Sequence, residues 1–406
     1  MAIIAAHIFF NVAVVVRTVG GYWSQLSRDD EHAARTLGST PAQTFFGITL
    51  RRLQPAITAA LSIVFLFSFT SFGVVLILGG SRYRTLETEI YRFAINRTDF
   101  STAAVLSVVQ LVAVVGLVWI TLRLRDRLPK RDSLTVDRAR LPRSTRSKWL
   151  TRVVVLASLL LLMLPILTLV EASLRVGDDW SFRHFASLNE RPASMTVTPL
   201  RAAANSVFFA GCAALIAVGI GGWASIAIAF GRRRISRLTD IAYLLPLGTS
   251  AVTLGFGILI TFDSWPLDIR QSWVIIPLAQ ALIGVPFVTR AVSPVLSAID
   301  PHVREAAATL GAEPSRVRRD IDLPIAKRAV SIGAAFAFAI SLGEFGATSF
   351  VGRQPDLMTL PLAIGRLLGR PGETLRGQAM ALSVILMVIT VTVLLLVDRN
   401  DSSDII

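Results

Sequence analysis

The feature that most constrains the fold of this chain is a series of nine apolar stretches, each about long enough to cross a lipid bilayer. Hydrophobic residues make up 53% of the sequence and charged residues only 17%. A single soluble core could not bury that much apolar surface, whereas a bilayer accepts it. The sequence therefore predicts an all-α polytopic membrane protein. We expect its spans near residues 2–19, 57–79, 102–122, 150–174, 202–230, 238–262, 273–296, 329–351 and 378–397.

Basic residues are concentrated in alternate loops between these stretches. Residues 123–152 hold eleven Lys or Arg against three Asp, and residues 231–237 hold four Arg. Residues 81–101 are nearly balanced, with four Arg against three acids. Because Lys and Arg favour the cytoplasmic side of a membrane, this asymmetry predicts a cytoplasmic C-terminus and an outside position for Met1. The net charge of +14 is thus explained by the orientation of the chain in the lipid bilayer, and we expect no nucleic-acid partner.

One motif occurs twice in the basic loops, at an offset of 273 residues. The complete copy has Glu-Ala-Ala at 305–307, Gly311, nine further residues and then Ile-Asp-Leu-Pro at 321–324. Residues identical at this offset are Ala33 and Ala306, Ala34 and Ala307, Thr36 and Thr309, Leu37 and Leu310, Gly38 and Gly311, Ile48 and Ile321, and Leu50 and Leu323. A repeat in one register predicts two homologous helical bundles with a substrate path at their interface.

The complete copy has the local signals of a short capped helix. Asp300 followed by Pro301 is typical of a helix start, and Gly311 is typical of a left-handed cap at its end. We expect Pro324 to break the chain just before it re-enters the membrane. A plain surface helix-turn-helix between two spans is the alternative interpretation of a single copy.

The repeat also predicts how the chain is organised. The second unit begins near residue 150, so an equal first unit would begin about 123 residues before Met1. We therefore expect the first bundle to be incomplete, through a misassigned start or a broken gene. The expected segments are 1–122 with three spans and a degenerate loop at 28–55, a cytoplasmic linker at 123–149, a complete six-span half at 150–398 with its loop at 300–327, and a tail at 399–406.

The motif resembles the EAA loop of ABC importer permeases, which have the MetI-like fold. In that family the loop forms a coupling helix that lodges in a cytoplasmic ABC ATPase dimer, and an extracytoplasmic solute-binding protein delivers the substrate. The resemblance implies a multi-pass protein of a bacterial inner membrane. It also implies coupling roles for Glu305, Ala306, Ala307, Gly311, Ile321, Leu323 and Pro324, with Ala33, Ala34 and Gly38 as counterparts. The first copy departs from the pattern, since His32 replaces the Glu and Arg51 replaces the Pro.

Two such motifs in one chain resemble the fused permeases of thiamine and ferric-iron importers. The stretches at 7–11, 69–75 and 85–87 are more similar to the thiamine branch. The resemblance therefore implies thiamine as substrate, with ferric iron or another small solute left open.

Glu344 is an acidic residue inside the predicted span 329–351. A carboxylate in a bilayer costs about 2.5–3.5 kcal/mol, so it requires a partner or a watery cavity. It is therefore a candidate residue of the translocation path that would meet a cation; an internal ion pair or helix cap is an equal alternative. Gly219, Gly221 and Gly222 resemble part of a dinucleotide fingerprint, but within an apolar span they predict close helix packing.

The sequence contains no phosphate-binding loop of the Gly-x-x-x-x-Gly-Lys-Ser/Thr type and no Gly-Lys pair. Its four histidines lack metal-ligand spacing, and no catalytic constellation is present. We therefore expect no cofactor, no metal and no ATP hydrolysis by this chain. A membrane-embedded enzyme that uses Glu344, which would need a second intramembrane carboxylate or His, and a non-functional remnant remain as alternatives.

Overall fold

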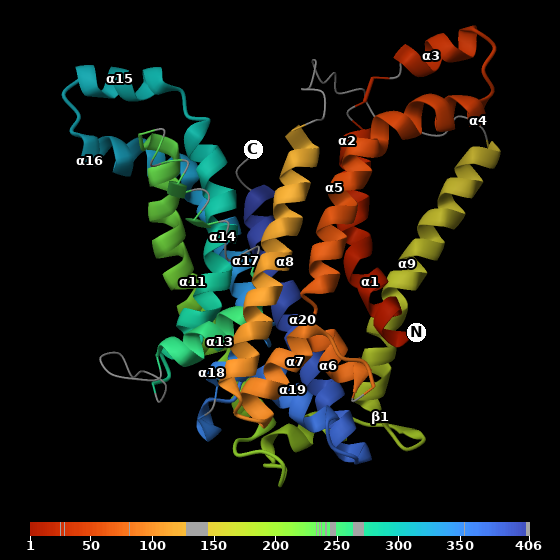
Figure 1. Cartoon of the computed structure of the whole chain (residues 1–406), viewed down its shortest axis with the longest axis vertical. Coiled ribbons are helices and arrows are strands. Elements are labelled where there is room, and N and C mark those ends of the chain that lie inside the picture. The colour runs from red at the N-terminus through yellow and green to blue at the C-terminus, as the bar shows by residue number, and fades with distance from the viewer. Residues whose placement is uncertain are drawn as a thin grey trace. The chain divides into compact units, whose positions relative to one another are not determined.

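The computed structural model describes residues 1–126 and 145–402, apart from 25, 28, 81, 233, 235, 237, 240, 241, 244–248, 263–271 and 353. Apart from a two-stranded antiparallel hairpin, β1 (Arg175–Val176) with β2 (Asp179–Trp180), the regular structure of these residues is helical, which confirms the all-α prediction (Figure 1). Most of the predicted linker 123–149 lies outside the described residues. The chain divides into two compact units, unit 1 with Met1–Thr88 and Val108–Leu167, and unit 2 with Glu89–Ser107 and Thr168–Ile406. The predicted division at 122 and 150 stays a prediction.

The helices of the described residues fall into two groups along the chain. Those of the first 126 residues are α1 (Ala2–Val15), η1 (Val16–Gly20), α2 (Gly21–Trp23), α3 (Asp29–Thr36), α4 (Pro41–Thr44), η2 (Phe45–Thr49), α5 (Leu50–Phe69), α6 (Gly73–Gly79), α7 (Leu86–Tyr91), η3 (Arg92–Asn96) and α8 (Phe100–Asp126). Those of residues 145–402 are α9 (Thr145–Leu174), α10 (Arg183–Ala186), η4 (Ser187–Asn189), α11 (Pro199–Phe230), α13 (Ala251–Thr261), α14 (Ile275–Ser297), α15 (Pro301–Thr309), α16 (Pro314–Val317), η5 (Arg318–Asp322), α17 (Leu323–Leu342), α18 (Thr348–Val351), η6 (Pro355–Leu357), α19 (Leu360–Leu368) and α20 (Glu373–Ser402).

Eight helical runs of the described residues are long and apolar enough to cross a membrane. They are Ala2–Trp23, Pro41–Phe69, Phe100–Ile120, Lys148–Leu174, Pro199–Phe230, Ile275–Ser297, Pro314–Leu342 and Glu373–Val397. Each corresponds to one predicted span. The ninth, at 238–262, is represented by the shorter helix α13.

Two predicted spans end earlier than expected. Helix α5 ends at Phe69 rather than 79, and α17 ends at Leu342 rather than 351. In the first case the Thr70 hydroxyl bonds back to the carbonyl of Leu66 as the chain leaves the helix; in the second, Gly343 forms the end of the helix. Hydropathy alone could not locate these ends because the short helices that follow, α6 and α18, are themselves apolar.

The repeat recognised in the sequence is also a repeat of structure. Shifted by 273 residues, α4, η2 and α5 coincide in both bounds with α16, η5 and α17, and the first residues of α1 and α8 coincide with those of α14 and α20. The shared bounds include the π-helical turns η2 and η5. Each unit therefore contains the same order of a span, a short helix, a connector and a second span. The connector is α4 with η2 in unit 1 and α16 with η5 in unit 2.

The core of unit 2 is a close three-helix contact between α11, α14 and α17. Val288 of α14 is fully buried. A Cβ on Gly221 would lie 2.9 Å from the Val288 Cβ, and one on Gly333 would lie 2.9 Å from the Val288 Cα. The close packing predicted for Gly221 is confirmed, because only a residue without a side chain fits there. For Gly219 and Gly222 it is wrong, since no described atom lies within 4 Å of their Cβ positions.

Candidate functional site

Helix α15 carries the complete motif at one end of unit 2, and α18 and α19 lie at the other end (Figure 1). The start of α15 is set by the Asp300 carboxylate, which accepts a hydrogen bond from the backbone N–H of His302 at 2.9 Å. At its end Gly311 has φ +81°, and the Ala312 N–H donates to the Ala307 carbonyl. This pattern is a Schellman cap, which requires a left-handed residue that glycine supplies without strain. Both predicted ends of the helix are confirmed.

Helix α3 has the same end in unit 1. Gly38 has φ +91°, and the Ser39 N–H donates to the Ala34 carbonyl at 3.0 Å, the equivalent of the bond from Ala312 to Ala307 at the same length. The departures of the first copy from the motif have therefore not altered the turn. His32, in place of a glutamate, lies on the exposed side of α3.

The predicted coupling residues divide by exposure. Glu305 is exposed and its carboxylate lies 3.2 Å from Nδ1 of His302. Ala306 and Ala33 are also exposed, whereas Ala307 and Ala34 are half-buried. The exposed side of α15 therefore carries the small residue Ala306 beside the larger Glu305.

The most exposed apolar side chains of the two loops stand just before the capping glycines. Leu310 is 88% exposed and Leu37 is 87% exposed. Exposing one large aliphatic side chain is ordinary, but two at equivalent positions of a repeat indicate a common contact. Both positions hold leucine, but the match in residue type alone does not predict this exposure.

Arg304 ties the complete motif to the spans. Its Nε donates to the Asp322 carboxylate at 2.8 Å, its NH2 lies 3.4 Å from the Leu296 carbonyl, and its guanidinium lies 3.9 Å from the centre of the Phe230 ring. The side chains of Arg304 and Asp322 are 22% and 9% exposed. One cation thus connects α15 with η5 and the ends of α14 and α11.

Unit 1 has a link at the equivalent positions, with different chemistry. The Thr49 hydroxyl donates to the Glu31 carboxylate at 2.6 Å; 31 and 49 lie 273 before 304 and 322. A second link, between Arg52 and Asp30 at 2.9 Å, adds an exposed ion pair there. Comparison of residue identities could not reveal this correspondence because both members of the pair have changed type.

The predicted break at Pro324 is wrong. The chain passes from Pro314 to Leu342 as one helical run through the π-turn η5. Pro324 lies in the first turn of α17, where the wider turn before it accommodates a residue without an N–H. Arg51 takes the same place after η2, so the turn does not depend on proline. Ile321 is half-buried, whereas Leu323 is 59% exposed and Pro324 is exposed.

Glu344 lies between α17 and α18 and is 7% exposed. Its carboxylate accepts the backbone N–H groups of Ala347 at 2.6 Å and Thr348 at 2.9 Å, and also the Thr348 hydroxyl. These are the free donors at the start of α18, so the geometry supports the capping alternative. A role for Glu344 in the translocation path stays a prediction.

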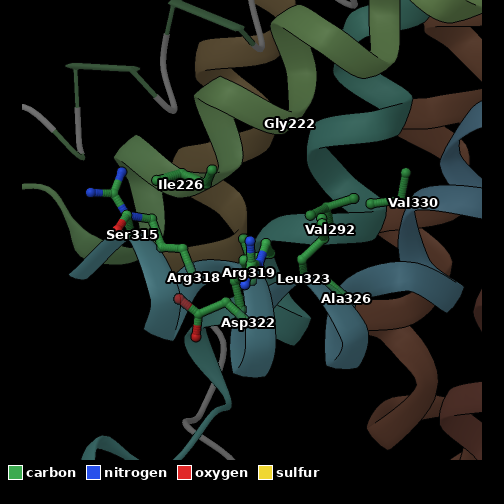
Figure 2. Close-up of a pocket in the computed structure, with 11 residues that line it drawn as sticks. Gly222, Ile226, Val292, Ser315, Arg318, Arg319, Asp322, Leu323, Ala326 and Val330 are labelled. Atoms are coloured by element: carbon green, nitrogen blue, oxygen red, sulfur yellow. The ribbon is translucent and has the colours of Figure 1, made fainter. Parts of the chain in front are cut away.

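A groove of about 410 Å³ lies beside the connector of unit 2. Figure 2 shows Ser315, Arg318 and Asp322 toward one side of it, and the apolar Val292 and Val330 toward the other. Among the described residues it is lined by Gly222, Ile226, Val292, Leu296, Ser315, Arg318, Arg319, Asp322, Leu323, Ala326 and Val330. The groove thus joins the basic connector to the apolar surfaces of α11, α14 and α17.

Comparison with known sequences gives one family and two kinds of relative. Residues 1–130 and 217–402 match the family described as binding-protein-dependent transport system inner membrane component. The thiamine transport system permease protein ThiP of Brucella abortus is 28% identical over 411 residues, which cover 99% of this chain and 72% of the relative. The putative 2-aminoethylphosphonate transport system permease protein PhnV of Salmonella typhimurium is 30% identical over 189 residues, which cover 46% of this chain and 69% of the relative.

Proposed function

The chain belongs to the inner-membrane component family of binding-protein-dependent ABC transport systems, and from this premise we propose that it forms the translocation path of an importer and couples that path to a separate cytoplasmic ATPase dimer. The family is one of transport permeases rather than enzymes, which removes the alternative of a membrane-embedded enzyme. An extracytoplasmic solute-binding protein is the proposed source of substrate.

The observation that carries the proposal is the duplicated docking loop. Gly38 and Gly311 end their helices with φ of +91° and +81°, and each is preceded by a leucine almost fully exposed, Leu37 or Leu310. A dimeric ATPase offers two equivalent receptor sites, and two equivalent loops match that symmetry. The links from Arg304 and Glu31 to the connectors would transmit movement of the ATPase to the spans.

The coupling proposal is tested by Gly311→Asp, which puts a branched anion into the docking turn. We expect loss of ATPase co-purification while the permease still inserts into the membrane. Gly177→Asp is the matched control, because Gly177 also has a positive φ, +62°, but lies in the β1–β2 turn. If Gly311→Asp retained the ATPase and transported normally, the coupling role of the loop would be refuted.

For the substrate we propose thiamine. The proposal is supported by the similarity to ThiP along 99% of this chain and by the local stretches at 7–11 and 69–75. An organophosphonate is the second candidate, because PhnV is 30% identical over part of the chain. Uptake of radiolabelled thiamine by cells that lack their own importer, supplied with this chain, its ATPase and its binding protein, tests both. Saturable uptake of labelled thiamine supports the proposal, whereas absence of thiamine uptake together with uptake of labelled 2-aminoethylphosphonate would replace it.

We propose that both docking loops and the C-terminus face the cytoplasm. The support is the concentration of Lys and Arg in these loops and in residues 123–152. A reporter that is active only in the cytoplasm, fused after Ile406, should be active. Activity of a reporter specific for the outside would reverse the orientation and exclude docking to a cytoplasmic ATPase.

A further inference from the structure

The groove between α11, α14 and α17 has two properties that an amphiphilic ligand satisfies together. One side carries Arg318 and Arg319, and the other side is apolar, with Val292, Ala326 and Val330. We propose that the groove binds an anionic phospholipid, with its phosphate against the two arginines and an acyl chain along the apolar side (Figure 2).

The charges around the groove favour an anion. The ionised side chains that line the groove are Arg318, Arg319 and Asp322, two cations against one anion. Asp322 is occupied by Arg304 at 2.8 Å, and Asp320 is shared by Arg316 at 3.4 Å and Arg319 at 3.0 Å. The Arg318 Nε donates to the Pro314 carbonyl at 3.2 Å, a neutral partner that leaves its charge uncompensated. Among the described residues Arg318 thus has no carboxylate partner, and the lining carries an excess of positive charge.

The position of the groove favours a lipid over a soluble anion. Its apolar lining comes from runs long enough to span a membrane, Pro199–Phe230, Ile275–Ser297 and Pro314–Leu342. The arginines lie on η5, before α17 begins. Basic pockets at this level between spans are suited to phospholipid headgroups. Gly222 on α11 presents no Cβ to the groove and leaves room for a chain.

The first copy of the repeat shows what the same turn looks like without the charges. Phe45 and Phe46 stand 273 residues before Arg318 and Arg319, in the equivalent π-turn η2. They are 36% and 68% exposed. Phenylalanines are therefore compatible with this backbone, so Arg318→Phe/Arg319→Phe removes the proposed headgroup contacts with little risk to the fold.

The test is binding of phosphatidylglycerol to the full chain purified in neutral detergent, measured by native mass spectrometry during a lipid titration. We expect saturable binding that phosphatidylcholine does not displace. Arg318→Phe/Arg319→Phe should weaken it about tenfold or more, since each basic contact near a headgroup contributes about 1 kcal/mol. The control is Arg51→Phe/Lys327→Phe, which removes the same number of charges from the first residues of α5 and α17 but leaves the lining of the groove unchanged.

Three outcomes would overturn the proposal. Equal binding by the arginine variant and the wild-type protein would show that the groove is not the site. Equally weakened lipid binding by the control variant would show that binding depends only on the net charge of the protein. Displacement by inorganic phosphate at the concentration of the lipid headgroup would identify an anion site that ignores the acyl chain. None of these outcomes bears on thiamine uptake, so the proposal fails or stands separately from the proposed function.

Discussion

Arg304 and Asp322 form an ion pair across 18 residues, and this pair holds α15 to the connector that leads into α17. Both side chains are largely shielded from solvent, so neither partner can exchange the contact for water without cost. The same two positions of unit 1 hold Glu31 and Thr49 at 2.6 Å. A link at this place is therefore common to both copies, while its charge is not.

Arg304→Gln should loosen α15, because it leaves the Asp322 carboxylate buried without its cation, at a cost of about 1–3 kcal/mol. We expect a lower Tm and a reduced response of the ATPase to substrate, with membrane insertion unchanged. Arg316→Gln is the control, since its pair with Asp320 is exposed and contributes only about 0–1 kcal/mol.

The double variant Arg304→Glu/Asp322→Thr reproduces the pair of unit 1. It should recover part of the lost Tm through a neutral hydroxyl bond to a carboxylate. Equal effects of Arg304→Gln and Arg316→Gln would show that the link does not hold the docking helix.

Gly311→Val should cost about 1–2 kcal/mol, because a branched residue resists the left-handed conformation at φ +81°. Gly311→Asn should cost less, since asparagine tolerates this region. No described atom lies within 4 Å of the Cβ position, so the difference reports on the backbone alone. Hydrogen exchange of residues 300–312 measures it. Identical exchange in the two variants would mean that the cap does not control the loop.

Gly221→Ala should lower the Tm of the protein, because the new methyl group would meet Val288 at 2.9 Å and overpacking costs about 1–3 kcal/mol. Gly219→Ala lies on the same helix with open space around it and should be neutral or stabilising by about 0.5–1 kcal/mol. Thermal unfolding in detergent compares the two. A decrease in Tm of the same size in both variants would show that the loss of stability comes from α11 itself and not from its contact with α14.

Glu344→Gln and Thr348→Val should destabilise the start of α18 to a similar extent, about 1 kcal/mol each, because both remove part of one capping arrangement. Comparison of the Tm and of the KM for uptake separates capping from substrate contact. We expect the KM to change little in either variant. A KM increase for a cationic substrate that is confined to Glu344→Gln would place this carboxylate on the translocation path.

The spans, the repeat and the ends of the docking helix followed from the sequence for local reasons. A bilayer requires about 20 apolar residues wherever a helix crosses it. A cap such as Asp300 or Gly311 acts within a few residues of its own position. The early ends of α5 and α17 could not be predicted in this way, because the residues that follow them are apolar as well.

The amino-acid sequence thus specified the class of protein, the register of its two copies and the local form of each loop that carries the motif. Which residues of separate helices meet was settled by tertiary packing: Arg304 lies against Asp322, and Val288 lies against Gly221 but not Gly219. Each of these contacts depends on which sides of two separate segments are packed together. The periodicity of one segment shows which of its sides is apolar, but not which other segment that side contacts.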